Sequence, residues 1–388
     1  MSRFRALFVS FAVAASVVVG IPWSASAQSS PLRLLGEYSF ESKRMYQDTT
    51  LGGLSGITYD AKRGVYYLVS DDRGENQPAR FYTARITLSM TGISNVEFIG
   101  VTTLDSDANT PGIQPYEKND LDLEDIALLP DDTLLITSER DLKPQPWIRR
   151  FGLDGSLLGE LPVPDKFKTV NQPGPDGRPQ TVKGTRNNLG FEGLALNPEG
   201  NAFYTANEEA LAQDGPIASL EAGTNIRVVK YEQHGTAWHP GNEWVYRTEK
   251  IFSATNPVGQ FADNGVSGML YVKHLLPQFD FLAMERSFAT GVGNDVNIYG
   301  VTIGEAPNVA AQDALPSPYT GRAVQKTLLV NMAKVGVSAD NLEGMTLGPR
   351  LPNGKQSLIV ISDDNFSAFD PPQINQFLLF EVDAGTTK

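Results

Sequence analysis

Leu54-Ser55-Gly56-Ile57 is the first of five similar tetrapeptides spread along a chain of 388 residues. The others are Leu123-Glu124-Asp125-Ile126, Phe191-Glu192-Gly193-Leu194, Val266-Ser267-Gly268-Met269 and Leu342-Glu343-Gly344-Met345. Their second residues stand at 55, 124, 192, 267 and 343, so the steps between them are 69, 68, 75 and 76 residues. A repeat of this length, built from short apolar runs, is typical of a closed ring of small β-sheets.

Each of the first four periods holds four short runs rich in Val, Ile, Tyr, Phe and Leu, separated by turn-forming residues. The fifth period holds only three such runs, at 344–347, 357–362 and 376–383, and the N-terminal run 32–40 can supply the fourth. We therefore predict an all-β fold, a single β-propeller of five four-stranded blades in which the N-terminal strand closes the last blade. Sharing a blade between the termini removes exposed sheet edges.

A six-bladed ring is the alternative. It requires another four-stranded sheet within one of the long connections at 104–122, 162–190 and 207–225. These segments lack the alternating pattern of strands, and 171–179 is a run of turn-forming residues, so we expect loops. Loops of this length in a compact domain are often functional.

The N-terminus has the pattern of an export signal. Arg3 and Arg5 precede an apolar run, which is followed by the small residues Ala25-Ser26-Ala27. We expect residues 1–27 to be a signal peptide and residues 28–388 to be the mature domain, exported to the periplasm or to the outside of the cell. No later stretch reaches about 18 consecutive apolar residues, so we expect no membrane insertion.

The composition is acidic, with 45 Asp and Glu against 32 Lys and Arg, and this balance argues against a nucleic-acid partner. Cysteine is absent and only three histidines are present, which excludes disulfides and disfavours zinc. The sequence also lacks a P-loop, a Rossmann glycine pattern and a His-Glu-x-x-His motif.

An acid follows each tetrapeptide, 15 to 20 residues after its second position. These acids are Asp71, Glu139, Glu208, Glu285 and Asp363. In a propeller blade the first two strands are antiparallel, so the start of the first and the end of the second lie on one face of the ring. Together with Glu124, Glu192 and Glu343, eight carboxylates are predicted to surround one mouth of the central channel.

Like charges brought this close raise one another's pKa values or recruit a cation. Carboxylate oxygens favour Ca²⁺, with Mg²⁺ as the alternative, so we predict that these eight acids form a metal site. The alternative for any single Glu is a structural role, in which its side chain accepts hydrogen bonds from backbone N–H groups between blades. Ser55 and Ser267 occupy the position at which the other blades have Glu, and we do not expect them to be nucleophiles.

Three arginines, Arg73, Arg140 and Arg286, lie beside predicted site acids. The planar guanidinium suits phosphate and carboxylate, so we predict that these three are the catalytic side chains that stabilise charge on an anionic substrate. Adjacent strand residues point to opposite faces, so pairing of the arginines with a neighbouring blade is an equal alternative.

These motifs together resemble the exported bacterial phytase-like domain family, also called esterase-like. The resemblance runs from about Leu35 to the C-terminus and rests on Gly52–Ile57 with Ser70–Arg73, Leu123–Leu128 with Ser138–Arg140, Phe191–Ala195 with Asn207–Glu208, and Leu342–Met345 with Ser362–Asn365. The family's name reflects similarity to calcium-dependent propeller phytases, which hydrolyse phosphate monoesters with calcium ions in the channel mouth. The resemblance implies an exported, metal-dependent hydrolase of a small phosphorylated substrate.

Two other functions remain open. One is a non-catalytic binding module in which calcium pins the channel, and the other is a structural envelope protein whose acids tie the blades together. We expect a monomer.

Overall fold

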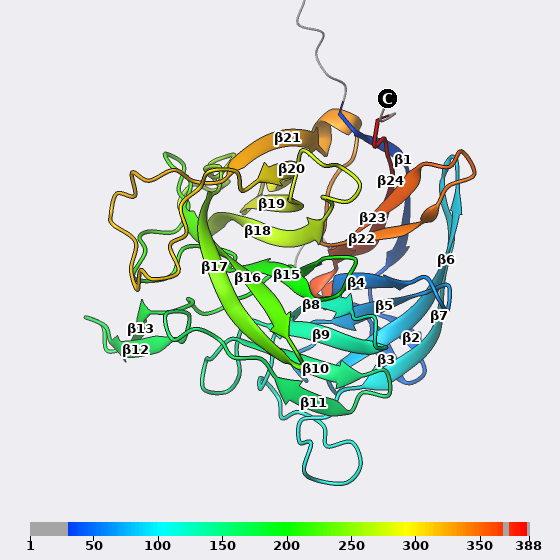
Figure 1. Cartoon of the computed structure of the whole chain (residues 1–388), viewed down its shortest axis with the longest axis horizontal. Helices are drawn as coiled ribbons and strands as arrows, with labels where there is room; N and C mark the ends of the chain where they lie inside the picture. The colour runs from blue at the N-terminus through cyan, green and yellow to red at the C-terminus, as the bar shows by residue number, and fades with distance from the viewer. Residues whose placement is uncertain (1–29, 368–371, 386–388) are drawn as a thin grey trace, which may run out of the picture. The chain divides into compact units, whose positions relative to one another are not determined.

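The computed structural model describes residues 30–367 and 372–385, and from Pro31 onward the chain forms one compact unit. The predicted signal peptide, residues 1–27, lies outside the described residues. Five four-stranded antiparallel sheets follow one another around a common centre (Figure 1). In each sheet the strand nearest the centre contains one of the five tetrapeptides or directly follows it.

The blades have these bounds. The first contains β4 (Leu54–Asp60), β5 (Val65–Ser70), β6 (Arg80–Ser89) and β7 (Gly92–Thr103). The second contains β8 (Leu123–Leu128), β9 (Thr133–Ser138), β10 (Trp147–Gly152) and β11 (Leu157–Glu160). The third contains β14 (Ala195–Leu196), β15 (Ala202–Ala206), β16 (Asn225–His234) and β17 (Ala237–Arg247). The fourth contains β18 (Ala262–Tyr271), β19 (Phe281–Ala289), β20 (Gly293–Thr302) and β21 (Gln325–Asn331).

The fifth blade joins the two ends of the chain. Its strands are β22 (Asn341–Arg350), β23 (Gln356–Asp363), β24 (Ile374–Val382) and β1 (Leu32–Glu41). The N-terminal strand β1 pairs antiparallel with β24, with Leu32 opposite Val382 and Glu41 opposite Ile374. The predicted five-bladed propeller, closed by the N-terminal strand, is therefore confirmed.

Two further hairpins lie outside the blades. They are β2 (Arg44–Tyr46) with β3 (Thr49–Leu51), and β12 (Val170–Pro173) with β13 (Pro179–Lys183). The expectation that 162–190 is entirely loop is therefore wrong in part. Its turn-forming residues build the tip of the second hairpin, where the N–H of Gly174 bonds to the carbonyl of Arg178.

The core lies between neighbouring blades. Every residue of β5 is buried, because one face of the first blade packs on the fifth blade and the other packs on the second. Leu68 belongs to the cluster that contains Phe377 of the fifth blade, and Tyr67 to the cluster that contains Trp147 of the second. Such two-sided burial produces continuous apolar runs instead of a strict alternation.

Two short 3₁₀ segments, Ala333–Val335 and Asn365–Ser367, are the helical elements within the described residues. None of the described helical segments has the length and apolar character needed to cross a membrane.

Candidate functional site

A β-bulge lies at each tetrapeptide. In the first blade Leu54 pairs with Ser70 but Gly56 pairs with Val69, so Ser55 is an extra residue in its strand. The pairing shifts by one residue at the same place in the other four blades. A bulge bends the strand and redirects a side chain. The repeated tetrapeptide therefore encodes one bulged residue per blade at the same end of the channel.

The third residue of the tetrapeptide is usually Gly, because the next blade approaches closely. A Cβ atom on Gly268 would lie only 2.1 Å from the backbone oxygen of Glu343 in the following blade. The second blade has Asp125 instead, and its Oδ2 accepts a 2.6 Å hydrogen bond from the N–H of Leu194 in the third blade. The tetrapeptides therefore contact one another around the ring.

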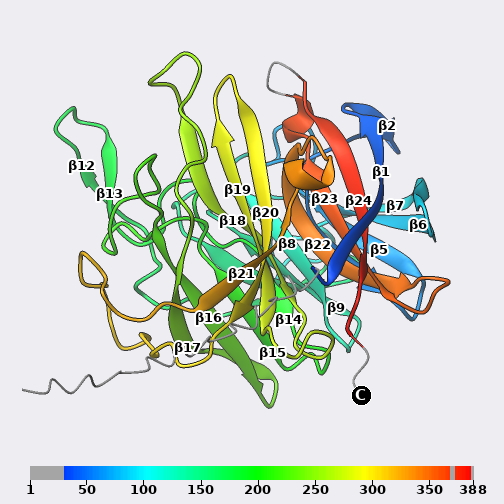
Figure 2. The same cartoon turned by 90° about the horizontal axis from the view of Figure 1, so that it is seen from above.

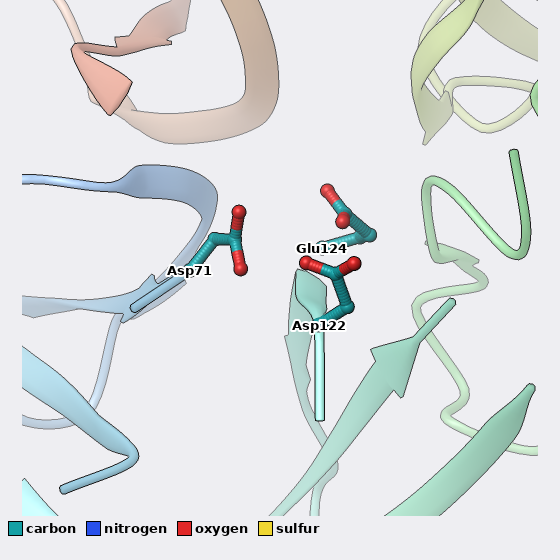
Figure 3. Close-up of side chains that lie close together, drawn as sticks. All are labelled: Asp71, Asp122 and Glu124. Carbon is teal, nitrogen blue, oxygen red and sulfur yellow. The ribbon is translucent and has the colours of Figure 1, made fainter. Parts of the chain in front are cut away.

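Carboxylates gather where these bulges meet. Oxygens of Asp71, Asp122 and Glu124 lie within 4.8 Å of one another, and Figure 3 shows the three side chains together. Oxygens of Glu124, Glu139 and Glu192 form a second such group. Glu124 belongs to both groups, so it stands between two positions that could each hold a metal ion.

The acids of the second group have raised pKa values. Burial raises the pKa of Glu124 well above its usual value, and the charges of Glu192 and Glu139 raise it further. Burial and the neighbouring Asp122 raise the pKa of Glu139 to about 8, although the N–H of Gly190 opposes this shift. Raised pKa values of this kind mean that the ionised forms are costly here, and a bound cation would lower that cost.

Several carboxylate oxygens lack a partner. Within the described residues, neither Glu124 nor Glu192 accepts a hydrogen bond or forms an ion pair through its carboxylate. Oε2 of Glu139 is buried without a hydrogen-bond donor, and so is Oδ1 of Asp71, which lies 3.8 Å from Nε of Arg73. Each such buried group costs about 1–3 kcal/mol. An all-oxygen set of this kind fits Ca²⁺, which takes six to eight oxygen ligands, or Mg²⁺.

Arg73 and Arg140 converge on Asp122, which is fully buried. Nε of Arg73 donates to one oxygen of Asp122 at 2.5 Å, and Nε of Arg140 donates to the other at 2.7 Å. Each also donates through an Nη to the 187–188 loop, Arg73 to Asn188 at 2.7 Å and Arg140 to Asn187 at 3.2 Å. The predicted pairing with a neighbouring blade thus applies to Arg73, and the predicted catalytic role stays a prediction.

Asp122 was not among the predicted site residues. Its signal in the sequence is its position directly before the second tetrapeptide, at the start of β8.

The structure corrects the placement of Glu285. Val266 pairs with Glu285, whereas the equivalent Leu54 and Leu342 pair with Ser70 and Ser362. Glu285 therefore occupies the position of those serines, and Arg286 occupies the position that is acidic in the other four blades. The reason is register, because a shift of one residue moves a side chain to the other face of the sheet.

The carboxylate of Glu285 points away from the predicted ring of acids. It accepts hydrogen bonds from the hydroxyl of Tyr246 at 2.6 Å, the N–H of Glu249 at 2.8 Å and the amine of Lys326 at 2.5 Å. These contacts tie the third and fourth blades together, which is the structural role considered above as the alternative.

Arg286 is the internal counterion of the mouth. Its Nη2 lies 3.0 Å from Glu208, and its Nη1 pairs with Glu343. Burial raises the pKa of Asp363, and the adjacent charge of Glu343 raises it further, so Asp363 belongs to the same group of acids. One buried guanidinium therefore compensates acids from the third and fifth blades.

The mouth holds more negative than positive groups. Its eight carboxylates are those of Asp71, Asp122, Glu124, Glu139, Glu192, Glu208, Glu343 and Asp363. Three guanidiniums oppose them, which leaves an excess of five carboxylates (8 − 3). Of the eight, Glu124 and Glu192, in the second and third blades, form neither a hydrogen bond nor an ion pair with these guanidiniums, although the charge of Arg286 opposes the rise that burial causes in the pKa of Glu192.

Ser55 and Ser267 link blades. Oγ of Ser55 donates to the carbonyl of Leu123 at 3.0 Å, and Oγ of Ser267 donates to the carbonyl of Leu342 at 2.9 Å. These bonds give the two serines a structural role.

The opposite end of the channel differs in character. A cavity of about 260 Å³ there is lined by residues from every blade, apolar ones such as Ile57, Leu194 and Met345 together with polar ones such as Thr58 and His274, and Asp125 is its one acidic residue. The acids therefore distinguish one mouth of the channel from the other.

The fold and the site define a five-bladed β-propeller with a buried acidic cluster, at one mouth of its channel, that could hold a metal ion. A family model described as "Phytase-like: Esterase-like activity of phytase" matches residues 49–366. The chain belongs to this phytase-like family.

The chain also matches several solved structures over most of its length. A structure from the GH130 family of mannoside phosphorylases has a TM-score of 0.42, with 10% identity over 92% of each chain. The aldose sugar dehydrogenase of Escherichia coli has a TM-score of 0.39, with 11% identity over 91% of this chain and 99% of its own. A putative glycoside hydrolase of Bacteroides ovatus also scores 0.39, with 9% identity over 94% and 97%. No match is found among curated proteins.

Proposed function

We propose that this protein is an exported hydrolase of phosphate esters that uses a metal ion, Ca²⁺ in the first instance, at the acidic mouth of its channel. One observation carries the proposal: buried Glu124 is shared by two groups of carboxylates and has no partner within the described residues. Membership in the phytase-like family supports the reaction class.

Glu124, Glu139 and Glu192 would hold the ion, and Asp71 would adjoin the second position. A divalent ion bound there would polarise a phosphoryl oxygen and lower the pKa of water. Asp122 is less available as a ligand, because two arginines already donate to its oxygens.

Arg73 and Arg140 are suited to contact the substrate. Their side chains are 30% and 21% exposed. Each guanidinium carries five N–H donors and uses Nε and one Nη in the contacts described above, so donors remain for a phosphate oxygen. Arg286 is only 14% exposed and uses both Nη atoms on acids, so it would position Glu208 and Glu343 instead.

The test compares the wild type with Glu192→Gln, after removal of metal and again with added Ca²⁺ or Mg²⁺. We expect Ca²⁺ to raise the melting temperature and to support release of phosphate from a generic phosphomonoester, and we expect Glu192→Gln to lose both effects. Glu305→Gln is the matched control, since Glu305 is 85% exposed and pairs with Arg322 away from the acidic mouth. No stabilisation of the wild type by either ion would refute the metal site.

A calcium-pinned binding module is the second candidate. It is favoured by the pairing of all three arginines with acids of the protein itself. Stabilisation by Ca²⁺ without release of phosphate from any phosphomonoester would support this function over the hydrolase.

Export is proposed from the N-terminal sequence alone. Mass spectrometry of the protein from a cell fraction outside the cytoplasm should give Gln28 as the first residue. An intact Met1 in the secreted or periplasmic fraction would contradict it.

A further inference from the structure

Exposed apolar side chains are concentrated on one face of the propeller. The described residues include fourteen large apolar side chains that are between 39% and 84% exposed. Twelve belong to connections on the face where the acidic mouth opens. The two exceptions, Leu158 and Leu328, lie in the outer strands β11 and β21. The connections on the opposite face contribute none of the fourteen.

The largest group comes from three neighbouring segments. It consists of Ile217, Leu220, Phe252, Val258, Phe261 and Val292, which we call the apolar rim. Backbone hydrogen bonds join the segments: the N–H of Ile251 donates to Ser219 at 2.9 Å, and the N–H of Thr290 donates to Phe261 at 3.1 Å. The tips of β18, β19 and β20 stand on the same side of the molecule as hairpins β12–β13 and β2–β3, at the top of Figure 2.

The apolar rim is continuous with the acidic mouth. Arg286 pairs across the strands with Gly265, and Phe261 lies four residues before Gly265. At about 3.3 Å per residue, the backbone of Phe261 is roughly 13 Å along the chain from the level of Arg286. A molecule with a phosphate at the mouth and an apolar chain of that length could contact both.

This arrangement is the reverse of a typical protein–protein interface, which has an apolar centre and a polar edge. Here the charged groups are central and the apolar groups surround them. An amphiphile offers the matching pattern, since apolar side chains can enter the outer 5–10 Å or so of a lipid layer while the charged group stays at the headgroup level.

We propose that the face carrying the acidic mouth docks on a lipid surface, and that the phosphate ester it acts on is a lipid headgroup. The choice of substrate rests on the proposed hydrolase function, whereas the docking rests only on the cation proposed for the same mouth. A formal net charge of −13 opposes binding to anionic lipid, so a divalent cation in the mouth is needed before a phosphate headgroup can approach.

The test is sedimentation of the protein with vesicles of phosphatidylcholine and phosphatidic acid, in Ca²⁺ and in chelator, because phosphatidic acid carries a phosphomonoester headgroup from which phosphate can be released. We expect the wild type to sediment in Ca²⁺. The double variant Val258→Ser and Phe261→Ser should bind at least about tenfold more weakly, because each side chain loses its apolar contact with the lipid. The control is the double variant Leu158→Ser and Leu328→Ser, which removes exposed apolar groups from the outer strands and should bind as the wild type does.

Absence of wild-type sedimentation in both conditions would overturn the proposal, as would equal binding by the rim variant. The protein could instead form a dimer in size-exclusion chromatography, lose the dimer on the rim substitutions and fail to bind vesicles. That result would also overturn the proposal and would show that a second copy of the chain covers the apolar rim. Vesicle binding without release of phosphate from phosphatidic acid would support docking and contradict a lipid substrate. Hydrolysis of a soluble phosphomonoester without vesicle binding would support the hydrolase and contradict the docking.

Discussion

Replacing Glu124 by Gln tests the shared position between the two groups of carboxylates. The substitution keeps the size of the side chain and removes one charge from both groups. If the ion is present at 100 times its dissociation constant, it stabilises the wild type by about 2.7 kcal/mol. If the substitution weakens binding about 100-fold, the same concentration stabilises the variant by only about 0.4 kcal/mol.

The shift in melting temperature equals the stabilisation energy divided by the unfolding entropy, which grows with the number of residues. An unfolding entropy of about 2.1 cal/mol/K per residue gives roughly 0.75 kcal/mol/K for the unit from Pro31 to Lys388. We therefore expect Ca²⁺ to raise the melting temperature by about 3.6 °C in the wild type and by about 0.5 °C in Glu124→Gln. In Ca²⁺ the wild type should be more stable than the variant. In chelator at pH 8 the variant should be more stable than the wild type, because it lacks one of the buried carboxylates that repel one another.

The assay is differential scanning calorimetry in Ca²⁺ and in chelator, with Glu305→Gln as the exposed control. The reversal of order is the decisive feature, because a side chain that only fills space would lower the melting temperature equally in both conditions. An equal loss in both conditions would refute the metal site at Glu124.

Three other predictions concern the same mouth. The pKa of Glu139 is raised to about 8 in the folded protein, from about 4.5 in the unfolded chain, so its contribution to stability is present at low pH and is lost as the pH rises through 8. Thermal melts in chelator between pH 5 and 8.5 should therefore show a melting temperature that falls with pH, and Ca²⁺ should suppress the fall. A melting temperature that does not change with pH would contradict the raised pKa. Arg286→Met should destabilise the protein by about 3–5 kcal/mol in urea unfolding without Ca²⁺, because Glu208 and Glu343 lose their buried partner, and a change below about 1 kcal/mol would contradict this pairing. Gly268→Ala should cost about 2 kcal/mol or more in urea unfolding, because the new Cβ would meet the backbone of Glu343. Gly100→Ala is the control, since the nearest atoms to its Cβ lie at 3.5 Å, and equal costs would refute the close approach of the blades.

The architecture was predictable because the repeat appears in the sequence itself. Five tetrapeptides set the number of blades, and the missing strand of the fifth blade could only come from 32–40. The hairpin β12–β13 was missed because its strands are short and exposed, and carry no apolar alternation. Such a hairpin depends on turn geometry, which composition alone does not determine.

The site was predictable in its type and less so in its members. Seven of the eight predicted acids meet at the mouth, but the spacing after Val266 does not determine the register, so Glu285 and Arg286 exchanged roles. Asp122 was missed because it lies one position before the tetrapeptide. Exposure of Phe261 and Val258 could not be read from the sequence, since it depends on which face of the ring their loops occupy.

The central claim is that Glu124, Glu139 and Glu192 bind a metal ion, and a crystal structure of the mature protein grown in Ca²⁺ tests it most directly. We predict anomalous density between these three carboxylates, with oxygens about 2.3–2.6 Å from the ion. The contrary result is that the carboxylates hydrogen-bond to one another, with no density between them at saturating Ca²⁺. That result would show that bound protons alone relieve the repulsion between these acids, and it would contradict the claim.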